Sequence, residues 1–115
     1  MNREILFRGY SPVIKGWVYG GFVSGENSWI VTIRDDGKFE HCMVDPATVG
    51  QFTGLCDNNG VRIFEGDVVS VDGKNHEVKY MLGQFFVGIN MPVAYVRFRC
   101  EVIGNIQDHP SLVQG

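Results

Sequence analysis

The segment Glu65-Gly66-Asp67 is the first candidate for chemistry, because it carries two acidic side chains two residues apart. On an extended backbone these carboxylates share a side, where they can bind a divalent ion or act as acid and base. A turn explains the same residues better, since Gly-Asp before an apolar strand commonly places the carboxylate on backbone N–H groups. The sequence designates no further oxygen ligands. We therefore predict a turn here and neither a metal nor a catalytic site.

A second acidic segment, Asp57-Asn58-Asn59-Gly60, superficially resembles a calcium-binding loop. Its glycine stands at the fourth position instead of the sixth, and no glutamate closes a loop of twelve residues. Asn-Gly is a strong signal for a tight hairpin. We predict a turn between two strands.

Nucleophiles and bases do not form a recognisable pair along the chain. His41 and Cys42 are neighbours, and consecutive residues of a strand point to opposite faces. His76 and His109 are isolated in sequence, although a site assembled through space remains open. The chain has three cysteines, Cys42, Cys56 and Cys100. An odd number of cysteines without CxxC spacing favours reduced structural thiols.

Basic and aromatic residues alternate between residues 94 and 99. If this segment is a strand, Tyr95, Arg97 and Arg99 share one face and Phe98 lies behind them. Proteins that bind single-stranded nucleic acids combine such groups. The alternative is that the arginines form ordinary surface ion pairs with Glu77, Glu101 or Asp108. The negative net charge of the chain favours this alternative.

Aromatic residues are numerous for a small domain, and we expect some of them to line a subunit interface or a partner groove. The residues concerned are Trp17, Tyr19, Phe22, Trp29, Phe85 and Phe86. The expected partner is a second copy of the chain or another protein.

Composition indicates one soluble β-rich domain. The chain has 115 residues, of which 44% are hydrophobic and 15 are glycine, about twice the usual frequency of roughly 7%. Its formal net charge of -3 does not favour a generic phosphate-binding surface. No signal peptide is visible, and no apolar run approaches the roughly 20 residues needed to span a bilayer.

Short runs rich in Val, Ile, Phe, Tyr and Trp alternate with turn residues, which predicts antiparallel strands and little helix. Two-residue or three-residue turns are expected at Asp35-Asp36-Gly37 and Asp72-Gly73. A 3₁₀ turn is expected after Asp45, which caps it, with Pro46 in its first position. Such strands favour a closed or nearly closed barrel, because closure removes unpaired edges. The expected strands are 5–8, 16–19, 28–33, 38–44, 51–53, 61–64, 67–71, 75–80, 84–89, 94–99 and 100–106.

Three ordered motifs then carry a resemblance to a known family. They are Arg3-Glu4-Ile5-Leu6-Phe7-Arg8; a long central motif from Val44 to Val69 that includes Gly50-Gln51-Phe52-Thr53-Gly54-Leu55 and Glu65-Gly66-Asp67-Val68-Val69; and Glu101-Val102-Ile103-Gly104-Asn105-Ile106. From end to end the chain resembles the YopX family of phage and prophage proteins. The resemblance implies an all-β fold containing an SH3-like barrel, a phage or prophage origin and a cytoplasmic location in the bacterial host. It implies no established activity and no catalytic residues.

We therefore expect a single domain over residues 1–115, with additional N-terminal strands over about 1–48 and the small antiparallel SH3-like barrel over about 49–110. The function favoured is a non-enzymatic interaction or self-assembling module without cofactor or metal. The alternatives are a binder of single-stranded nucleic acid, using Tyr95, Arg97 and Arg99, and, less favoured, a small-barrel nuclease.

Overall fold

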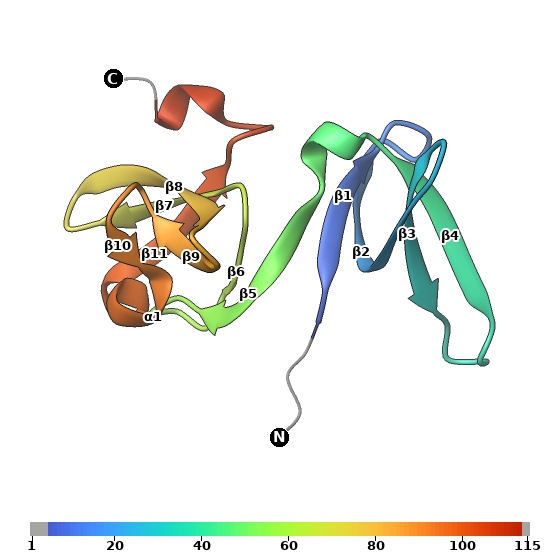
Figure 1. The fold of residues 1–115 in the computed structure, drawn as a ribbon, viewed down its shortest axis with the longest axis horizontal. Coiled ribbons are helices and arrows are strands. Elements are labelled where there is room, and N and C mark those ends of the chain that lie inside the picture. Colours follow the sequence, from blue (N-terminus) through green and yellow to red (C-terminus); the bar gives the residue numbers. More distant parts are fainter. Residues whose placement is uncertain (1–4, 114–115) are drawn as a thin grey trace. The chain divides into compact units, whose positions relative to one another are not determined.

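Short antiparallel strands make up most of the chain, which confirms the expected all-β class with minor helix. The computed structural model describes residues 5–113 (Figure 1). In chain order the strands are β1 (Phe7–Ser11), β2 (Gly16–Ser24), β3 (Ser28–Ile33), β4 (Phe39–Val44), β5 (Gly50–Cys56), β6 (Arg62–Phe64), β7 (Asp67–Val71), β8 (Lys74–Met81), β9 (Gln84–Val87), β10 (Met91–Pro92) and β11 (Cys100–Asn105). Arg3 and Glu4 of the N-terminal motif lie outside the described residues.

The predicted turns are confirmed. Asp72 and Gly73, between β7 and β8, both have positive φ, at 51° and 85°. A two-residue turn of this kind matches the right-handed twist of the strands that it joins. The 3₁₀ turn Pro46–Thr48 begins as predicted, because the Asp45 side chain accepts a hydrogen bond from the Ala47 N–H at 3.0 Å.

Two compact units divide the described chain, one ending at Gln51 and the other beginning at Phe52. The boundary falls inside β5. Gly50 and Gln51 pair with β1 in unit 1, and Phe52 and Cys56 pair with β6 in unit 2. The single domain over residues 1–115 and the closed or nearly closed barrel stay predictions.

Unit 1 is an antiparallel sheet in the order β4-β3-β2-β1-β5. The end of β4 returns to β1, where the Asp45 N–H donates to the Tyr10 carbonyl at 2.9 Å. Val44 lies over Gly9 of β1 so closely that a Cβ on this glycine would stand 3.0 Å from the valine. The sheet is therefore curled, and Gly9 permits the close approach.

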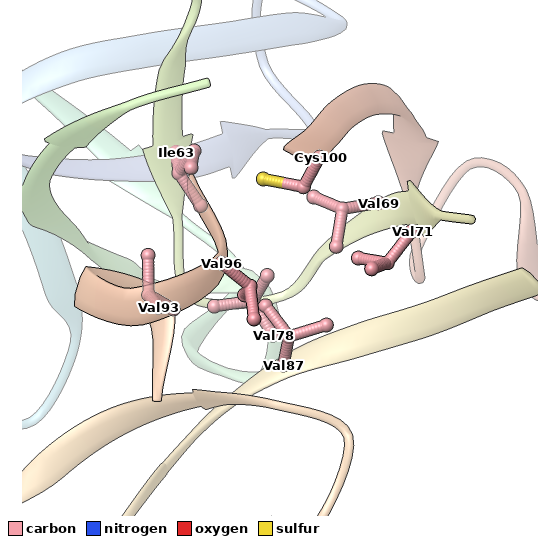
Figure 2. Packing of buried hydrophobic residues seen from close by; sticks show 8 residues of the cluster. All are labelled: Ile63, Val69, Val71, Val78, Val87, Val93, Val96 and Cys100. Carbon is pink, nitrogen blue, oxygen red and sulfur yellow. The ribbon is translucent and has the colours of Figure 1, made fainter. Parts of the chain in front are cut away.

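Unit 2 contains the principal core. Its sheet has the order β10-β9-β8-β7-β11, and Val93 and Val96 of the short helix α1 (Val93–Val96) pack with valines of that sheet (Figure 2). The buried cluster consists of Ile63, Val69, Val71, Val78, Val87, Val93, Val96 and Cys100. Burial of branched aliphatic side chains is the main stabilising term here.

The strand predicted over residues 94–99 is wrong. This segment forms the end of α1 and a 3₁₀ turn, Arg97–Arg99. Val93 and Val96 are three residues apart, and a helical turn points both into the core, whereas an extended backbone would point them to opposite faces. Core packing therefore outweighs the local preference of Val, Tyr and Phe for strands.

Candidate functional site

The α1 corner, comprising Tyr95, Arg97, Phe98 and Arg99, brings the predicted site residues together in a different geometry. Tyr95 is 82% exposed and Phe98 is 71% exposed. Their spacing of three residues along successive helical turns places both rings on the side away from the core. Phe98 is thus part of the exposed surface and does not lie behind the arginines.

Both arginines of the α1 corner have neighbours that restrict them. The Arg97 guanidinium carbon lies 4.3 Å from the centre of the Phe98 ring, a cation–π contact. Arg99 lies 3.9 Å from an Asp72 carboxylate oxygen, and both side chains are largely exposed, so the pair adds little stability. The sequence predicts surface ion pairs for these arginines with Glu77, Glu101 or Asp108, whereas the partner of Arg99 in the structure is Asp72.

Asp57 joins three parts of unit 2. Its Oδ1 accepts the N–H groups of Asn59 and Val61, at 2.8 and 2.9 Å, and its Oδ2 accepts the N–H of Val102 at 2.8 Å. The first two bonds close the predicted turn, and the third ties this turn to β11. These contacts confirm the turn interpretation and show a structural role for a buried carboxylate that local spacing does not reveal.

The contacts of Asp67 confirm the turn predicted at Glu65-Gly66-Asp67. Its Oδ2 accepts the N–H of Phe64 at 2.7 Å, and the intervening Gly66 has a φ of 91°. The carboxylate is almost fully buried, in a position where it stabilises the turn between β6 and β7. Among residues 5–113 no three His, Cys, Asp or Glu side chains gather as a metal site.

The cysteines are unpaired thiols in different settings. Cys100 is fully buried, and burial, together with the negative charge of Asp57, raises the pKa of its thiol, while Arg97 opposes this change. The Cys42 thiol donates to the Ser11 hydroxyl oxygen, with Sγ and Oγ 3.1 Å apart. Cys56 is half-buried. A raised pKa leaves less reactive thiolate, which agrees with a structural role for Cys100.

The histidines of the described chain are held separately. The His41 ring lies edge-on to Trp29, with ring centres 5.2 Å apart, in unit 1. His109 Nδ1 accepts the N–H of Asn105 at 3.3 Å in unit 2. His76 lies beside Gly88.

Unit 1 displays apolar side chains on both sides of its sheet. A groove of about 470 Å³ is lined by residues that include Ile14, Val18, Phe39 and His41. The cross-strand neighbours Ile33 and Phe39 are 67% and 68% exposed. Of the six predicted interface aromatics, Tyr19 is exposed, Phe86 is buried, and the others are half-buried: Trp17, Phe22, Trp29 and Phe85.

The sequence resemblance is confirmed by comparison with known proteins. The model of the YopX protein family matches residues 6–114, and the chain belongs to this family. No curated protein matches it. Protein EF1440 from Enterococcus faecalis has a similar crystal structure, with a TM-score of 0.64 and 23% sequence identity over 98% of this chain and 100% of that one. At this identity the likeness concerns the fold alone. No helix in the described part of the chain is long and apolar enough to cross a membrane.

Proposed function

We propose that this chain is a non-enzymatic, self-assembling module of phage or prophage origin that acts in the cytoplasm of a bacterial host. Unit 2 serves in this proposal as the SH3-like barrel that supports the assembly. The observation that carries the proposal is the distribution of apolar side chains in unit 1. Among residues 5–51 its buried apolar side chains are Ile30 and Val44. Its exposed ones are Ile5, Val13, Ile14, Tyr19, Val23, Ile33 and Phe39.

A second copy of the chain would cover part of this surface. Removing a large apolar side chain from water contributes about 1.5–3 kcal/mol, so Ile33 and Phe39 are strong candidates for an interface. They are neighbours on β3 and β4 and are both about two-thirds exposed. Exposed apolar clusters of this kind commonly mark protein contacts.

The absence of enzymatic activity is part of the proposal. The strongest acidic candidates are engaged in folding, because Asp57 and Asp67 both accept backbone N–H groups. A carboxylate held in this way stabilises its turn.

Light scattering during size-exclusion chromatography tests the proposal on the full chain. We expect a molar mass above that of the 12.9 kDa monomer, and we expect it to rise with concentration. The double substitution Ile33→Asn with Phe39→Asn should lower the oligomer fraction at least tenfold. A strict monomer at every concentration would contradict self-assembly.

The matched control lies in unit 2. Leu82→Asn with Ile89→Asn likewise replaces two large apolar side chains by amides, at positions that are more exposed. This control should retain the oligomer. If it dissociates while the Ile33 and Phe39 variant stays assembled, the interface belongs to unit 2 and not to the apolar surface of unit 1.

A second candidate function is favoured by the α1 corner. Tyr95 and Phe98 offer two exposed rings for base stacking, each worth about 1–3 kcal/mol per base in known complexes, and Arg97 and Arg99 add positive charge. Fluorescence polarisation with single-stranded DNA and RNA oligonucleotides should then show salt-dependent binding that Arg97→Ala with Arg99→Ala removes. No binding at low salt would end this candidate.

A further inference from the structure

Positive charge is concentrated in one stretch of unit 2. From Val78 to Cys100 the sequence contains no aspartate or glutamate, although the whole chain has a net charge of -3. This stretch also carries the two exposed rings of the α1 corner. An anionic partner with flat rings therefore complements the α1 corner in both charge and chemistry. The cations of the stretch are Lys79, Arg97 and Arg99.

An acidic side chain reaches the α1 corner from another part of unit 2. Asp72 lies in the turn between β7 and β8, and its carboxylate oxygen Oδ2 lies 3.9 Å from a guanidinium nitrogen of Arg99. Strand β11 begins at Cys100, directly after Arg99, and Cys100 lies opposite Val71 of β7. The pairing of β7 with β11 therefore holds the turn that contains Asp72 beside Arg99.

The backbone of this turn does not by itself require an aspartate. Asp72 has a φ of 51°, in the left-handed region that asparagine and glycine also adopt. Leu82 has nearly the same φ, 52°, in the turn between β8 and β9, so even a leucine occupies this backbone conformation. What the aspartate adds to the turn is its charge. That charge lies next to a cation of a candidate binding surface.

The ion pair between Asp72 and Arg99 is incomplete. Its separation of 3.9 Å exceeds the upper end of N–H···O hydrogen-bond distances, about 3.2 Å, and both side chains are more than half exposed to water. A phosphate can accept two parallel N–H bonds from one guanidinium group, which is a stronger interaction than a carboxylate at this distance supplies. An incoming phosphate can therefore replace Asp72 at Arg99.

We propose that the Asp72 carboxylate occupies the place of a phosphate in the α1 corner and competes with the ligand for Arg99. The ligand class is a single-stranded nucleic acid, in which one phosphate displaces Asp72 while neighbouring bases stack on Tyr95 and Phe98. This inference rests on the second candidate function and adds to it the residue that regulates the affinity.

Competition by Asp72 favours ligands that also stack. A free anion displaces Asp72 from Arg99 without gaining another contact, so its net binding is weak. A single strand gains stacking on two exposed rings in the same event. An acidic peptide brings carboxylates but lacks a base beside each charge. The α1 corner should therefore prefer a single strand to a free anion and to an acidic peptide.

The two arginines should respond differently to the loss of the Asp72 charge. Arg97 stacks on the Phe98 ring at 4.3 Å, whereas Arg99 is the arginine beside Asp72. Removing the charge of Asp72 frees Arg99 for the ligand and leaves the contact of Arg97 with Phe98 unchanged. Energetic coupling in ligand binding is therefore expected between Asp72 and Arg99, and not between Asp72 and Arg97.

Fluorescence polarisation with a labelled single-stranded oligothymidylate at low salt tests this competition on the full chain. Asp72→Asn keeps a residue that suits the turn and removes the charge. It should tighten binding about threefold, the scale of an exposed ion pair. Combined with Arg99→Ala, this gain should fall below about 1.5-fold, whereas combined with Arg97→Ala it should remain about threefold.

The matched control is Asp35→Asn in unit 1. It makes the same change in net charge at an exposed position of the turn between β3 and β4. The affinity for the oligonucleotide should stay within about 1.5-fold of the wild-type value, because salt screens distant charges. A gain equal to that of Asp72→Asn would show an effect of net charge alone and would contradict the competition.

The outcomes separate the competition from the function on which it rests. No binding by the wild-type chain or by Asp72→Asn overturns the second candidate function and the competition together. Equal affinities of these two chains overturn the competition alone, as does a gain that persists undiminished with Arg99→Ala. Displacement of the oligonucleotide by inorganic phosphate or polyglutamate at equal charge concentration overturns the choice of a single strand as the ligand.

Discussion

Units 1 and 2 use similar antiparallel strands in opposite ways. Unit 2 buries an aliphatic cluster in which Ile63, Val69, Val78 and Val87 are fully inaccessible to water. Unit 1 buries Ile30 and Val44 and leaves Ile33 and Phe39 largely exposed. The two units also differ in the arrangement of their strands. Unit 2 adds α1 to its sheet, whereas unit 1 curls a single sheet.

The difference concerns the core and not the exposed apolar surface, since unit 2 also exposes large apolar side chains such as Leu82 and Ile89. Burial of apolar area contributes roughly 25 cal/mol per Å², so the core of unit 2 should supply most of the folding free energy. The sheet of unit 1 depends more on backbone pairing and on close approach at Gly9 and Gly20. Both tryptophans, Trp17 and Trp29, lie in unit 1, so their fluorescence can be compared with circular dichroism of the whole chain.

The largest effect is expected for Asp57→Ala in unit 2. Three backbone N–H groups lose their acceptor, and leaving buried donors unpaired costs about 4 kcal/mol in total. Urea unfolding followed by circular dichroism should show this loss. If the units unfold separately, the tryptophan transition of unit 1 should stay in place.

Asp57→Asn is the matched control for charge. It keeps one acceptor oxygen and should lose about half as much stability. If Asp57→Ala shifts the urea transitions seen by circular dichroism and by tryptophan fluorescence equally, the chain is one cooperative domain, as the sequence predicts. The two units would then not unfold independently.

A pair of identical substitutions compares the two units directly. Ile63→Ala should cost about 3 kcal/mol, because it leaves a cavity in the core of unit 2. Ile33→Ala removes the same atoms from a largely exposed position of unit 1 and should cost less than about 0.5 kcal/mol in the monomer. Urea midpoints at low protein concentration give both values. Equal costs would mean that unit 1 has a core comparable with that of unit 2.

Gly20→Ala tests the close packing of unit 1. A Cβ on Gly20 would lie 2.2 Å from the Val31 carbonyl oxygen, so β2 and β3 must move apart. We expect a cost of about 2 kcal/mol. Gly16→Ala, also on β2, has no atom within 4 Å of the added carbon and should be nearly neutral. Tryptophan fluorescence is the measurement, since Trp17 and Trp29 lie on these two strands. A neutral Gly20→Ala would show that the curl of the sheet adjusts freely.

Local patterns predicted much of this fold. Turn chemistry located the hairpin at Asp72-Gly73 and the cap at Asp45, because both depend on neighbouring residues alone. The family signature located the chain among YopX proteins. Residues 94–99 were assigned wrongly, since their strand preference is overridden by contacts of Val93 and Val96 with distant strands.

The candidate site was predicted less completely. Tyr95, Arg97 and Arg99 do lie together, but the exposed position of Phe98 depends on the helical turn. The bond from Val102 to Asp57 joins residues 45 positions apart, and no local spacing encodes it. The return of the end of β4 to β1, where the Asp45 N–H donates to the Tyr10 carbonyl, depends on the strand order of unit 1, which sequence patterns do not specify.

The smallest expected effect is the alkaline response of the unit 2 core at Cys100. Burial first, and Asp57 second, raise the pKa of this thiol above its ordinary value of 9.0. Above about pH 9 the unfolded chain therefore loses this proton more readily than the folded chain, and the stability present below that pH declines as pH rises.

Cys100→Ala should lower stability at pH 8, where a buried sulfur is lost, and reduce the decline between pH 8 and pH 10. Cys56→Ala should keep the wild-type decline, because Cys100 is still present. Urea midpoints at the two pH values measure the difference; an equal decline in Cys100→Ala and wild type would contradict the contribution of this thiol.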